Sequence, residues 1–190
     1  MTGIVGLLLA AGRSQRFGSD KRLQPLADGT PMALAAARKL ASACQRSIVV
    51  IRPGDTALAG LLNDAGLETL VCPSAELGMG HSLAGGVAAS VDAASWLVGL
   101  ADMPYIQPAS YRAVIAAMQG GAGLARAFYG TRPGHPVGFA AEHRDALLAL
   151  TGDQGGKAIL EAHPGLLLPC PVDDPGVLHD VDRPEQIGPP

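Results

Sequence analysis

The fold class follows from one stretch near the N-terminus, Ile4-Val5-Gly6-Leu7-Leu8-Leu9-Ala10. This stretch is apolar without alternation, which is typical of a parallel strand that is buried on both faces. A secretory signal peptide is the alternative interpretation of an apolar N-terminal run. Because no basic side chain precedes the run, a buried strand that enters the glycine turn at Gly12 explains it better.

Similar apolar runs alternate with helix-length segments as far as residue 120. We expect further strands at residues 47–52, 67–72 and 96–101 and helices at residues 31–43, 56–65, 81–92 and 108–118. This alternation predicts an α/β protein with a Rossmann-like, doubly wound and mostly parallel sheet. After residue 120 the pattern changes, and we expect strands at 124–128 and 136–139, joined by a loop at 129–135. These two strands predict a short antiparallel element in the second half.

Composition limits the classes of function. The chain has 190 residues, a formal net charge of −3 and 4% aromatic residues. Nucleic-acid-binding proteins normally carry a basic excess, so we expect no nucleic-acid partner. The sequence contains no run of 18 consecutive apolar residues, so we expect no membrane span. The 3 cysteines form no CxxC pair, so neither a zinc site nor a disulfide framework is indicated. We therefore expect one cytoplasmic domain over residues 1–190, with no membrane partner.

Small and basic residues follow the first strand, at the sheet edge where ligands bind in open parallel sheets. The turn Ala10-Ala11-Gly12 leads to Arg13, Arg16 and Lys21. Small side chains let phosphate approach the backbone N–H groups and the cations neutralise its oxygens, so the segment predicts a polyphosphate site. It is not a P-loop, because no Gly-Lys-Ser/Thr is present. An exposed turn with ordinary basic residues explains the pattern about equally well.

Acidic residues follow two later segments. Asp102 comes directly after the strand at 96–101, while Asp180 and Asp182 lie on the same side of an extended segment near the C-terminus. Carboxylates at the sheet edge can hold Mg²⁺ together with substrate phosphates. The alternatives are a turn or helix N-cap role for Asp102, which is the commoner one for Asp before Pro, and a polar strand face for the other two.

Three glycine-containing segments are further candidates for ligand binding. Gly78-Met79-Gly80-His81-Ser82-Leu83 would let a base or ribose approach the backbone, but Leu83 occupies the third position of a dinucleotide fingerprint, which requires Gly or Ala. Gly134-His135-Pro136 places a histidine in a restricted loop over a cleft. Gly152-Asp153-Gln154-Gly155-Gly156-Lys157 can cradle an anion at a helix start. Ordinary turns also account for each of the three.

Five motifs together resemble those of the molybdenum cofactor nucleotidyltransferases. The first, Leu9-Ala10-Ala11-Gly12-x-Ser14-x-Arg16-Phe17-Gly18-x-x-Lys21, resembles the nucleotide-binding signature of that family. In the family's order follow Leu100-Ala101-Asp102-Met103-Pro104, Gly134-His135-Pro136-Val137, Gly152-Asp153-x-Gly155 and Asp180-Val181-Asp182-x-Pro184-Glu185. The Ala-Ala-Gly turn, the 78–83 segment and the His-Pro element are most similar to the CTP:molybdenum cofactor cytidylyltransferases. Phe17 and Arg183 depart from the usual Met and Thr.

The resemblance implies a fold of the nucleotide-diphospho-sugar transferase type, in which residues 1–120 bind the nucleotide and residues 121–190 the acceptor. It implies transfer of CMP from CTP to the terminal phosphate of molybdenum cofactor, with release of pyrophosphate and with Mg²⁺ as cofactor. A molybdoenzyme that receives the product is then an expected partner.

The resemblance also assigns roles to residues. It implies that the catalytic residues are Arg13, Lys21 and Asp102. The implied nucleotide contacts are Leu9, Ala10, Ala11, Gly12, Arg13, Lys21, Gly80, His81 and Ser82. The implied acceptor contacts are His135, Pro136, Gly152 and Asp153, and the implied metal ligands are Asp102 and Asp182. The sequence does not decide between Asp180 and Asp182 as the second ligand.

Other functions stay open at this point. The acceptor can be a sugar or polyol phosphate, and the nucleotide can be GTP or another nucleoside triphosphate. A noncatalytic, nucleotide- or cofactor-binding maturation chaperone is the alternative from a different class, although such a protein is expected to lack one of the catalytic charges. A dehydrogenase is disfavoured by the incomplete fingerprint at residues 78–83.

Overall fold

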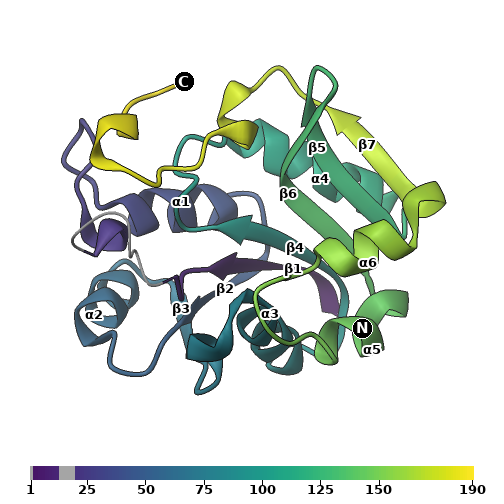
Figure 1. Ribbon diagram of the computed structural model, residues 1–190, viewed down its shortest axis with the longest axis horizontal. Helices are drawn as coiled ribbons and strands as arrows, with labels where there is room; N and C mark the ends of the chain where they lie inside the picture. Colours follow the sequence, from purple (N-terminus) through teal and green to yellow (C-terminus); the bar gives the residue numbers. More distant parts are fainter. Residues whose placement is uncertain (1, 13–19) are drawn as a thin grey trace.

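The computed structural model describes residues 2–12 and 20–190, except for the side chain of Thr2. Within these residues, seven strands form one sheet in the order β3-β2-β1-β4-β6-β5-β7 (Figure 1). The strands are β1 (Thr2–Leu9), β2 (Arg46–Ile51), β3 (Glu68–Val71), β4 (Ala93–Leu100), β5 (Leu124–Tyr129), β6 (Arg132–Ala140) and β7 (Leu167–Pro171). Neighbouring strands are parallel except that β6 runs antiparallel to β4 and β5. The predicted mostly parallel sheet with an antiparallel element is confirmed.

The strand order reverses between β1 and β4, so that these two neighbours continue to opposite sides of the sheet. From β1 the chain moves through β2 to β3 and then returns to β4, on the other side of β1. β1 and β4 are parallel and in register, so that Leu9 and Leu100 lie side by side at their carboxyl ends. Such a reversal sends the two following loops apart and leaves a crevice, which is where open α/β sheets bind ligands.

Helices cover both faces of the sheet (Figure 1). One face carries α1 (Met32–Ala41), α2 (Thr56–Asp64) and α4 (Pro108–Gln119), and the other carries α3 (Met79–Ala88), α5 (Arg144–Leu148) and α6 (Lys157–Ala162). Among the helices of the described residues, none combines the length and the apolar character that a membrane span needs.

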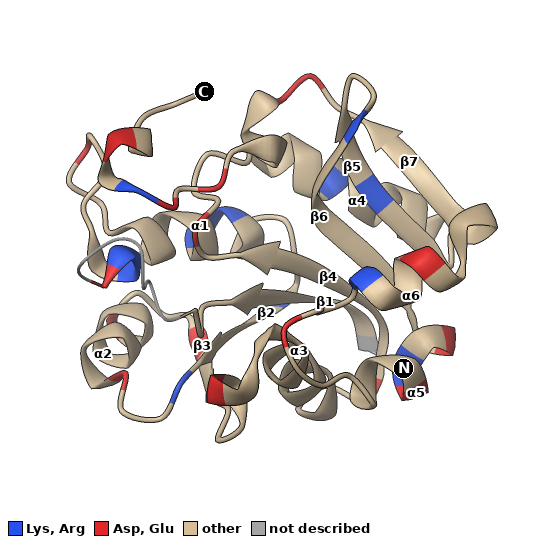
Figure 2. Cartoon of the chain, viewed as in Figure 1, with Lys and Arg blue, Asp and Glu red and all other residues tan. Residues whose placement is uncertain are grey.

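The two buried cores follow from the period of two along β1. Leu8 packs with the first group of helices, whereas Val5, Leu7 and Leu9 pack with the second. Neither β1 nor β4 contains a charged residue, and Figure 2 shows both strands in tan between the two helical layers. The uninterrupted apolar runs therefore mark strands that are buried on both faces.

Two elements differ from the sequence prediction. α3 begins at Met79 and not near residue 81, so most of the 78–83 segment is the first turn of a helix. The predicted loop at 129–135 is wrong, because β6 begins at Arg132 and His135 lies within this strand. Pro133 and Gly134 are typical of loops, but a shift of register between Arg126 and Phe128 of β5 accommodates them in the sheet.

Candidate nucleotide site

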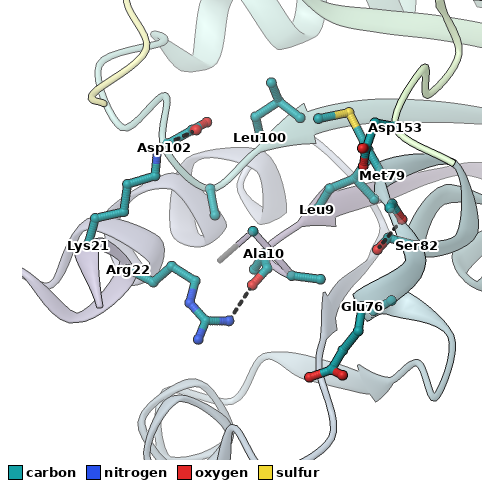
Figure 3. A pocket seen from close by; sticks show the side chains of 15 residues that line it. Leu9, Ala10, Lys21, Arg22, Glu76, Met79, Ser82, Leu100, Asp102 and Asp153 are labelled. Atoms are coloured by element: carbon teal, nitrogen blue, oxygen red, sulfur yellow. Dashed lines mark hydrogen bonds and ion pairs between the residues drawn. The ribbon is translucent and has the colours of Figure 1, made fainter. Parts of the chain in front are cut away.

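A cavity of about 430 Å³ opens at the carboxyl ends of β1 and β4 (Figure 3). The ends of both strands, the short 3₁₀ helix η1 (Lys21–Leu23) and the start of α3 surround it. Its lining residues are Leu9, Ala10, Ala11, Gly12, Lys21, Arg22, Ala75, Glu76, Gly78, Met79, Ser82, Leu100, Ala101, Asp102 and Asp153. The sheet topology therefore brings the basic and acidic groups that follow different strands to one place.

Lys21 is the centre of an ion-pair cluster on one side of this cavity. Its Nζ donates to Asp102 Oδ2 at 2.8 Å, to Asp182 Oδ1 at 2.9 Å and to the carbonyl oxygen of Val181 at 3.0 Å. The Lys21 side chain is 10% exposed, whereas those of Asp102 and Asp182 are 27% and 33% exposed. Figure 3 shows Lys21 pointing from η1 toward Asp102. Three side chains from distant parts of the sequence therefore meet here, and two of them, Lys21 and Asp102, line the cavity.

Opposing effects determine the pKa of Lys21. Burial lowers this pKa, but the charge of Asp102 and the hydrogen bonds to Asp102 and Asp182 outweigh burial and raise it above the ordinary 10.5. The ammonium is therefore charged at neutral pH. An ammonium has three N–H donors, and among the described residues it has three acceptors at hydrogen-bonding distance.

The C-terminal segment is attached to the end of β4. The N–H of Val181 donates to the carbonyl oxygen of Asp102 at 2.8 Å, and the Val181 side chain is fully buried. Asp182 reaches Lys21 from this segment, whereas Asp180 is exposed. Of the two acids that the sequence left open, Asp182 contacts the same ammonium as Asp102, and the role of either acid as a metal ligand stays a prediction.

Asp102 and Asp182 provide oxygen ligands of the kind that hard divalent cations prefer. Both carboxylates already converge on one positive charge, the ammonium of Lys21. The described residues contain no group of three or more His, Cys, Asp or Glu side chains arranged for a metal ion. A cation at this pair therefore needs substrate phosphates or water as further ligands, which is how Mg²⁺ usually binds. The donor set fits Mg²⁺ bound together with a nucleotide.

Arg22 is a cavity residue that the sequence analysis did not identify. Its guanidinium donates to Asp20, to Asp55 and to the carbonyl oxygen of Ala10, at 2.5 to 2.7 Å. These bonds use all five N–H donors of an arginine. Because Asp55 precedes α2, Arg22 connects the end of β1 to a different loop. The sequence carries little signal for this pairing, because Asp55 is 33 residues away along the chain.

The turn after β1 presents small residues to the cavity. Leu9, Ala10, Ala11 and Gly12 all line it, as the proposed nucleotide contacts should. The N–H of Ala10 donates to the carbonyl oxygen of Val50 at 2.9 Å, which anchors the turn to β2. The predicted contact Arg13 lies outside the described residues.

The start of α3 forms the opposite side of the cavity. Gly78 precedes the helix with φ of 133°, a conformation that favours glycine, and the N–H of Gly80 donates to the carbonyl oxygen of Gly152 at 2.7 Å. Ser82 lines the cavity, whereas Gly80 and His81 are not among its lining residues. A helix N-terminus stabilises anions, so this end of α3 suits a negatively charged ligand. The nucleotide-binding roles of Gly80, His81 and Ser82 stay predictions.

Asp153, predicted at the acceptor, lies at the first cavity. Figure 3 shows it beside Met79 and Ser82, across the cavity from Lys21. The backbone contact of Gly152 with α3 positions this segment. The acceptor-binding roles of Gly152 and Asp153 also stay predictions.

A second cavity, of about 280 Å³, shares Leu9, Met79 and Leu100 with the first. Its other lining residues are mainly apolar, with a few polar groups: Leu83, Val98, Arg126, His135, Val137, Phe139, Gln154, Gly156, Lys157 and Leu160. Because the two cavities share residues, a ligand in one lies next to a ligand in the other.

His135 lines the second cavity, as predicted, and Pro136 beside it is buried. Burial, together with the charge of Arg126, lowers the pKa of His135 to about 4. Within the described residues, no hydrogen-bond partner reaches its Nδ1. His135 is therefore neutral at pH 7, and the positive charge of this cavity comes from Arg126 and Lys157. The Nε of Arg126 donates to the carbonyl oxygen of Gly134 at 2.7 Å.

The arrangement suits a reaction between two negatively charged ligands. The first cavity combines a buried ammonium, a carboxylate pair and a helix N-terminus, which are suited to a metal-bound polyphosphate. Neither set of lining residues contains a cysteine, and the only serine and histidine, Ser82 and His135, belong to different cavities. Catalysis by positioning and charge neutralisation therefore fits these residues better than catalysis by a protein nucleophile.

Comparison with known proteins agrees with this geometry. Residues 6–166 match the family model of the MobA-like NTP transferase domain. Purine catabolism protein PucB of Bacillus subtilis (strain 168) is 28% identical over 193 residues, which cover 96% of this chain and 93% of PucB. The crystal structure of Rv0371c from Mycobacterium tuberculosis H37Rv has a TM-score of 0.84 and 27% identity, over 97% of this chain and 96% of Rv0371c. A manganese complex of Rv0371c has a TM-score of 0.82 and 25% identity, with the same coverage of 97% and 96%.

A seven-stranded α/β sheet with a polyphosphate-compatible cavity at its point of reversal defines the class as a nucleotidyltransferase. The chain belongs to the MobA-like NTP transferase domain family. The predicted MobA-like transferase family is thereby confirmed, whereas the resemblance to the cytidylyltransferases stays a prediction.

Proposed function

We propose that this nucleotidyltransferase transfers CMP from CTP to the terminal phosphate of molybdenum cofactor and releases pyrophosphate. The convergence of Lys21, Asp102 and Asp182 beside the first cavity carries the proposal. CTP is proposed because the Ala10-Ala11-Gly12 turn resembles that of the cytidylyltransferases.

The first cavity is the proposed triphosphate site. Lys21 and the backbone after β1 bind the phosphates, and Arg13 completes the set of cations in this proposal. Asp102 and Asp182 hold Mg²⁺, which when bound neutralises phosphate oxygens and makes the phosphorus more electrophilic. The crystallisation of Rv0371c with manganese supports a divalent cation in the related chain described here.

In the proposed reaction, a phosphate oxygen of the acceptor attacks the α-phosphorus of CTP. A new P–O bond forms, the bond between the α-phosphorus and the oxygen that bridges to the β-phosphate breaks, and that oxygen leaves with pyrophosphate. Lys21 stabilises the negative charge that grows on the leaving group. The protein contributes position and charge, as in other phosphoryl transfers, and no covalent intermediate on the chain is needed.

The second cavity is the proposed acceptor pocket. Its apolar lining by Val98, Val137 and Phe139 suits a flat heteroaromatic ring such as a pterin. Arg126 and Lys157 offset the charge of the acceptor phosphate. The residues shared with the first cavity bring that phosphate close to the nucleotide.

Pyrophosphate release tests the proposal directly. The purified protein is assayed with Mg²⁺ and CTP, GTP or ATP, each with molybdenum cofactor, with a sugar phosphate or with a polyol phosphate as acceptor. We expect the highest kcat/KM with CTP and molybdenum cofactor. Preference for GTP contradicts the base assignment, and turnover only with another acceptor contradicts the acceptor assignment.

Asp102→Asn should lower kcat by about 10²- to 10³-fold, because it removes one preorganised charge from the reacting centre. The free energy of unfolding, measured with urea, should change by about 1 kcal/mol or less, because the carboxylate is partly exposed. Asp180→Asn is the matched control on an exposed carboxylate and should keep kcat within about twofold of the wild type. Full activity of Asp102→Asn would remove Asp102 from the metal site.

A further inference from the structure

Lys21 has two proposed tasks that its contacts do not allow at the same time. Its three N–H donors are bonded to Asp102, Val181 and Asp182. The proposed function requires Lys21 to bind the triphosphate, and it requires the same two carboxylates to bind a divalent cation. In the structure, the position between these carboxylates is held by an ammonium group.

We infer that Lys21 is an exchangeable internal counter-ion that couples binding of the divalent cation to binding of the nucleotide. Without nucleotide, Lys21 offsets part of the negative charge of Asp102 and Asp182. With the metal-bound nucleotide, Lys21 moves to the phosphates and leaves both carboxylates to the metal. The inference rests on the proposed function and adds the order of events: cation and nucleotide bind together, and the cation alone binds weakly.

Charge explains the coupling. A divalent cation next to the Lys21 ammonium would be repelled by it at close range, and this repulsion is strong at a partly buried position. The triphosphate supplies new negative partners for Lys21 and removes the competition. Each ligand therefore raises the affinity of the other, as thermodynamic linkage requires.

The surroundings of Lys21 allow the exchange. Lys21 and Asp102 both line the first cavity, so the ammonium has a path from the carboxylate to a ligand. A lysine is a point charge on a flexible four-carbon stem, so it can change partners without moving the backbone. The partner carboxylates of Asp102 and Asp182 are about a third exposed or less, and so are accessible to a metal ion.

Binding of Mn²⁺ without nucleotide tests the inference, with free Mn²⁺ followed by electron paramagnetic resonance. We expect Lys21→Met to bind Mn²⁺ at least about tenfold more tightly than the wild type, because the competing charge is gone. Lys39→Met is the matched control, since Lys39 is a partly buried lysine that donates to the carbonyl oxygen of Pro104 at 2.7 Å. This control should bind Mn²⁺ like the wild type.

Adding Asp182→Asn to Lys21→Met should abolish the gain in affinity, which locates the bound Mn²⁺ at the carboxylate pair. Unchanged or weaker Mn²⁺ binding by folded Lys21→Met overturns the inference. A second measurement needs no Lys21 variant: without nucleotide, the wild type should bind Mn²⁺ as weakly as Asp102→Asn. Tight Mn²⁺ binding by the wild type alone also overturns the inference.

These outcomes are distinct from failure of the proposed function. If the wild type releases pyrophosphate from CTP but Lys21→Met gains no Mn²⁺ affinity, the counter-ion inference is wrong and the proposed function stands. If Lys21→Met gains affinity but the wild type transfers no CMP to molybdenum cofactor, the substrate assignment is wrong while the exchange at the carboxylates is supported.

Discussion

Lys21 and Arg22 are adjacent, buried cations, but they belong to clusters of different character. Lys21 bonds Asp102 and Asp182, whose side chains are 27% and 33% exposed, and Asp102 lines the first cavity. Arg22 bonds Asp20 and Asp55, and the Asp55 side chain is only 10% exposed. Both cations line the first cavity, but only Lys21 has a carboxylate partner, Asp102, among the lining residues. The partners of Arg22 connect the end of β1 to the loop before α2.

The two clusters indicate that the shape and flexibility of the charged group separate a structural cation from a functional one. Burial and pairing with two aspartates do not, because both residues share them. Arg22 has a rigid, planar group whose five donors are all bonded to the framework of the fold. Lys21 has a compact charge on a flexible stem, and its carboxylate partners can be offered to a ligand.

The largest effect expected from this comparison is on stability. Arg22→Met should lower the free energy of unfolding by about 3 kcal/mol, because it leaves Asp20 and Asp55 without their main partner in a mostly buried place. Lys21→Met should cost only about 1 kcal/mol, because water can solvate both of its partners, which are 27% and 33% exposed, whereas Asp55 is only 10% exposed. Urea unfolding of both variants measures the difference. Equal losses would mean that the two clusters have the same structural role.

An intermediate effect is expected on acid stability. Burial raises the pKa of Asp55, but hydrogen bonds from Arg22 and Arg52 outweigh it, so the pKa lies below the ordinary 3.8. The unfolded chain therefore takes up protons first as the pH falls, and stability that is present above about pH 4 is lost below it. Between pH 5 and 3, Arg22→Met should lose about 1 kcal/mol less stability than the wild type in urea titrations. If the free energy of unfolding falls equally with pH in the variant and the wild type, Arg22 does not lower the pKa of Asp55.

The smallest effect is expected for Lys21→Arg, which keeps the charge but changes its shape. A planar guanidinium cannot offer one nitrogen to three convergent acceptors, so we expect a loss of about 1 kcal/mol or less in the free energy of unfolding. Because the positive charge at position 21 still competes with Mn²⁺ for Asp102 and Asp182, the Mn²⁺ affinity without nucleotide should stay within about twofold of the wild type. A tenfold gain in Mn²⁺ affinity would show that shape, and not charge, keeps the metal away.

Local patterns were sufficient to predict most of the fold. β1 and β4 could be predicted from their own residues, without their neighbours in the sheet. A strand that is buried on both faces excludes charged residues along its whole length. The strand predicted at 136–139 is part of β6, but its beginning at Arg132 was missed since Pro133 and Gly134 favour loops, and the irregular pairing with β5 overrides that preference. The division into a nucleotide-binding half and an acceptor-binding half remains a prediction.

The α/β class and the MobA-like family could be read from the amino-acid sequence, because both depend on short segments and their order. The tertiary structure decided which distant residues meet. In the folded chain Asp182, and not Asp180, contacts Lys21, Arg22 pairs with Asp55, and Asp153 lies at the first cavity. The physical reason is that hydrogen bonds and ion pairs act over a few ångströms in space, whereas their partners here come from separate loops at one edge of the sheet.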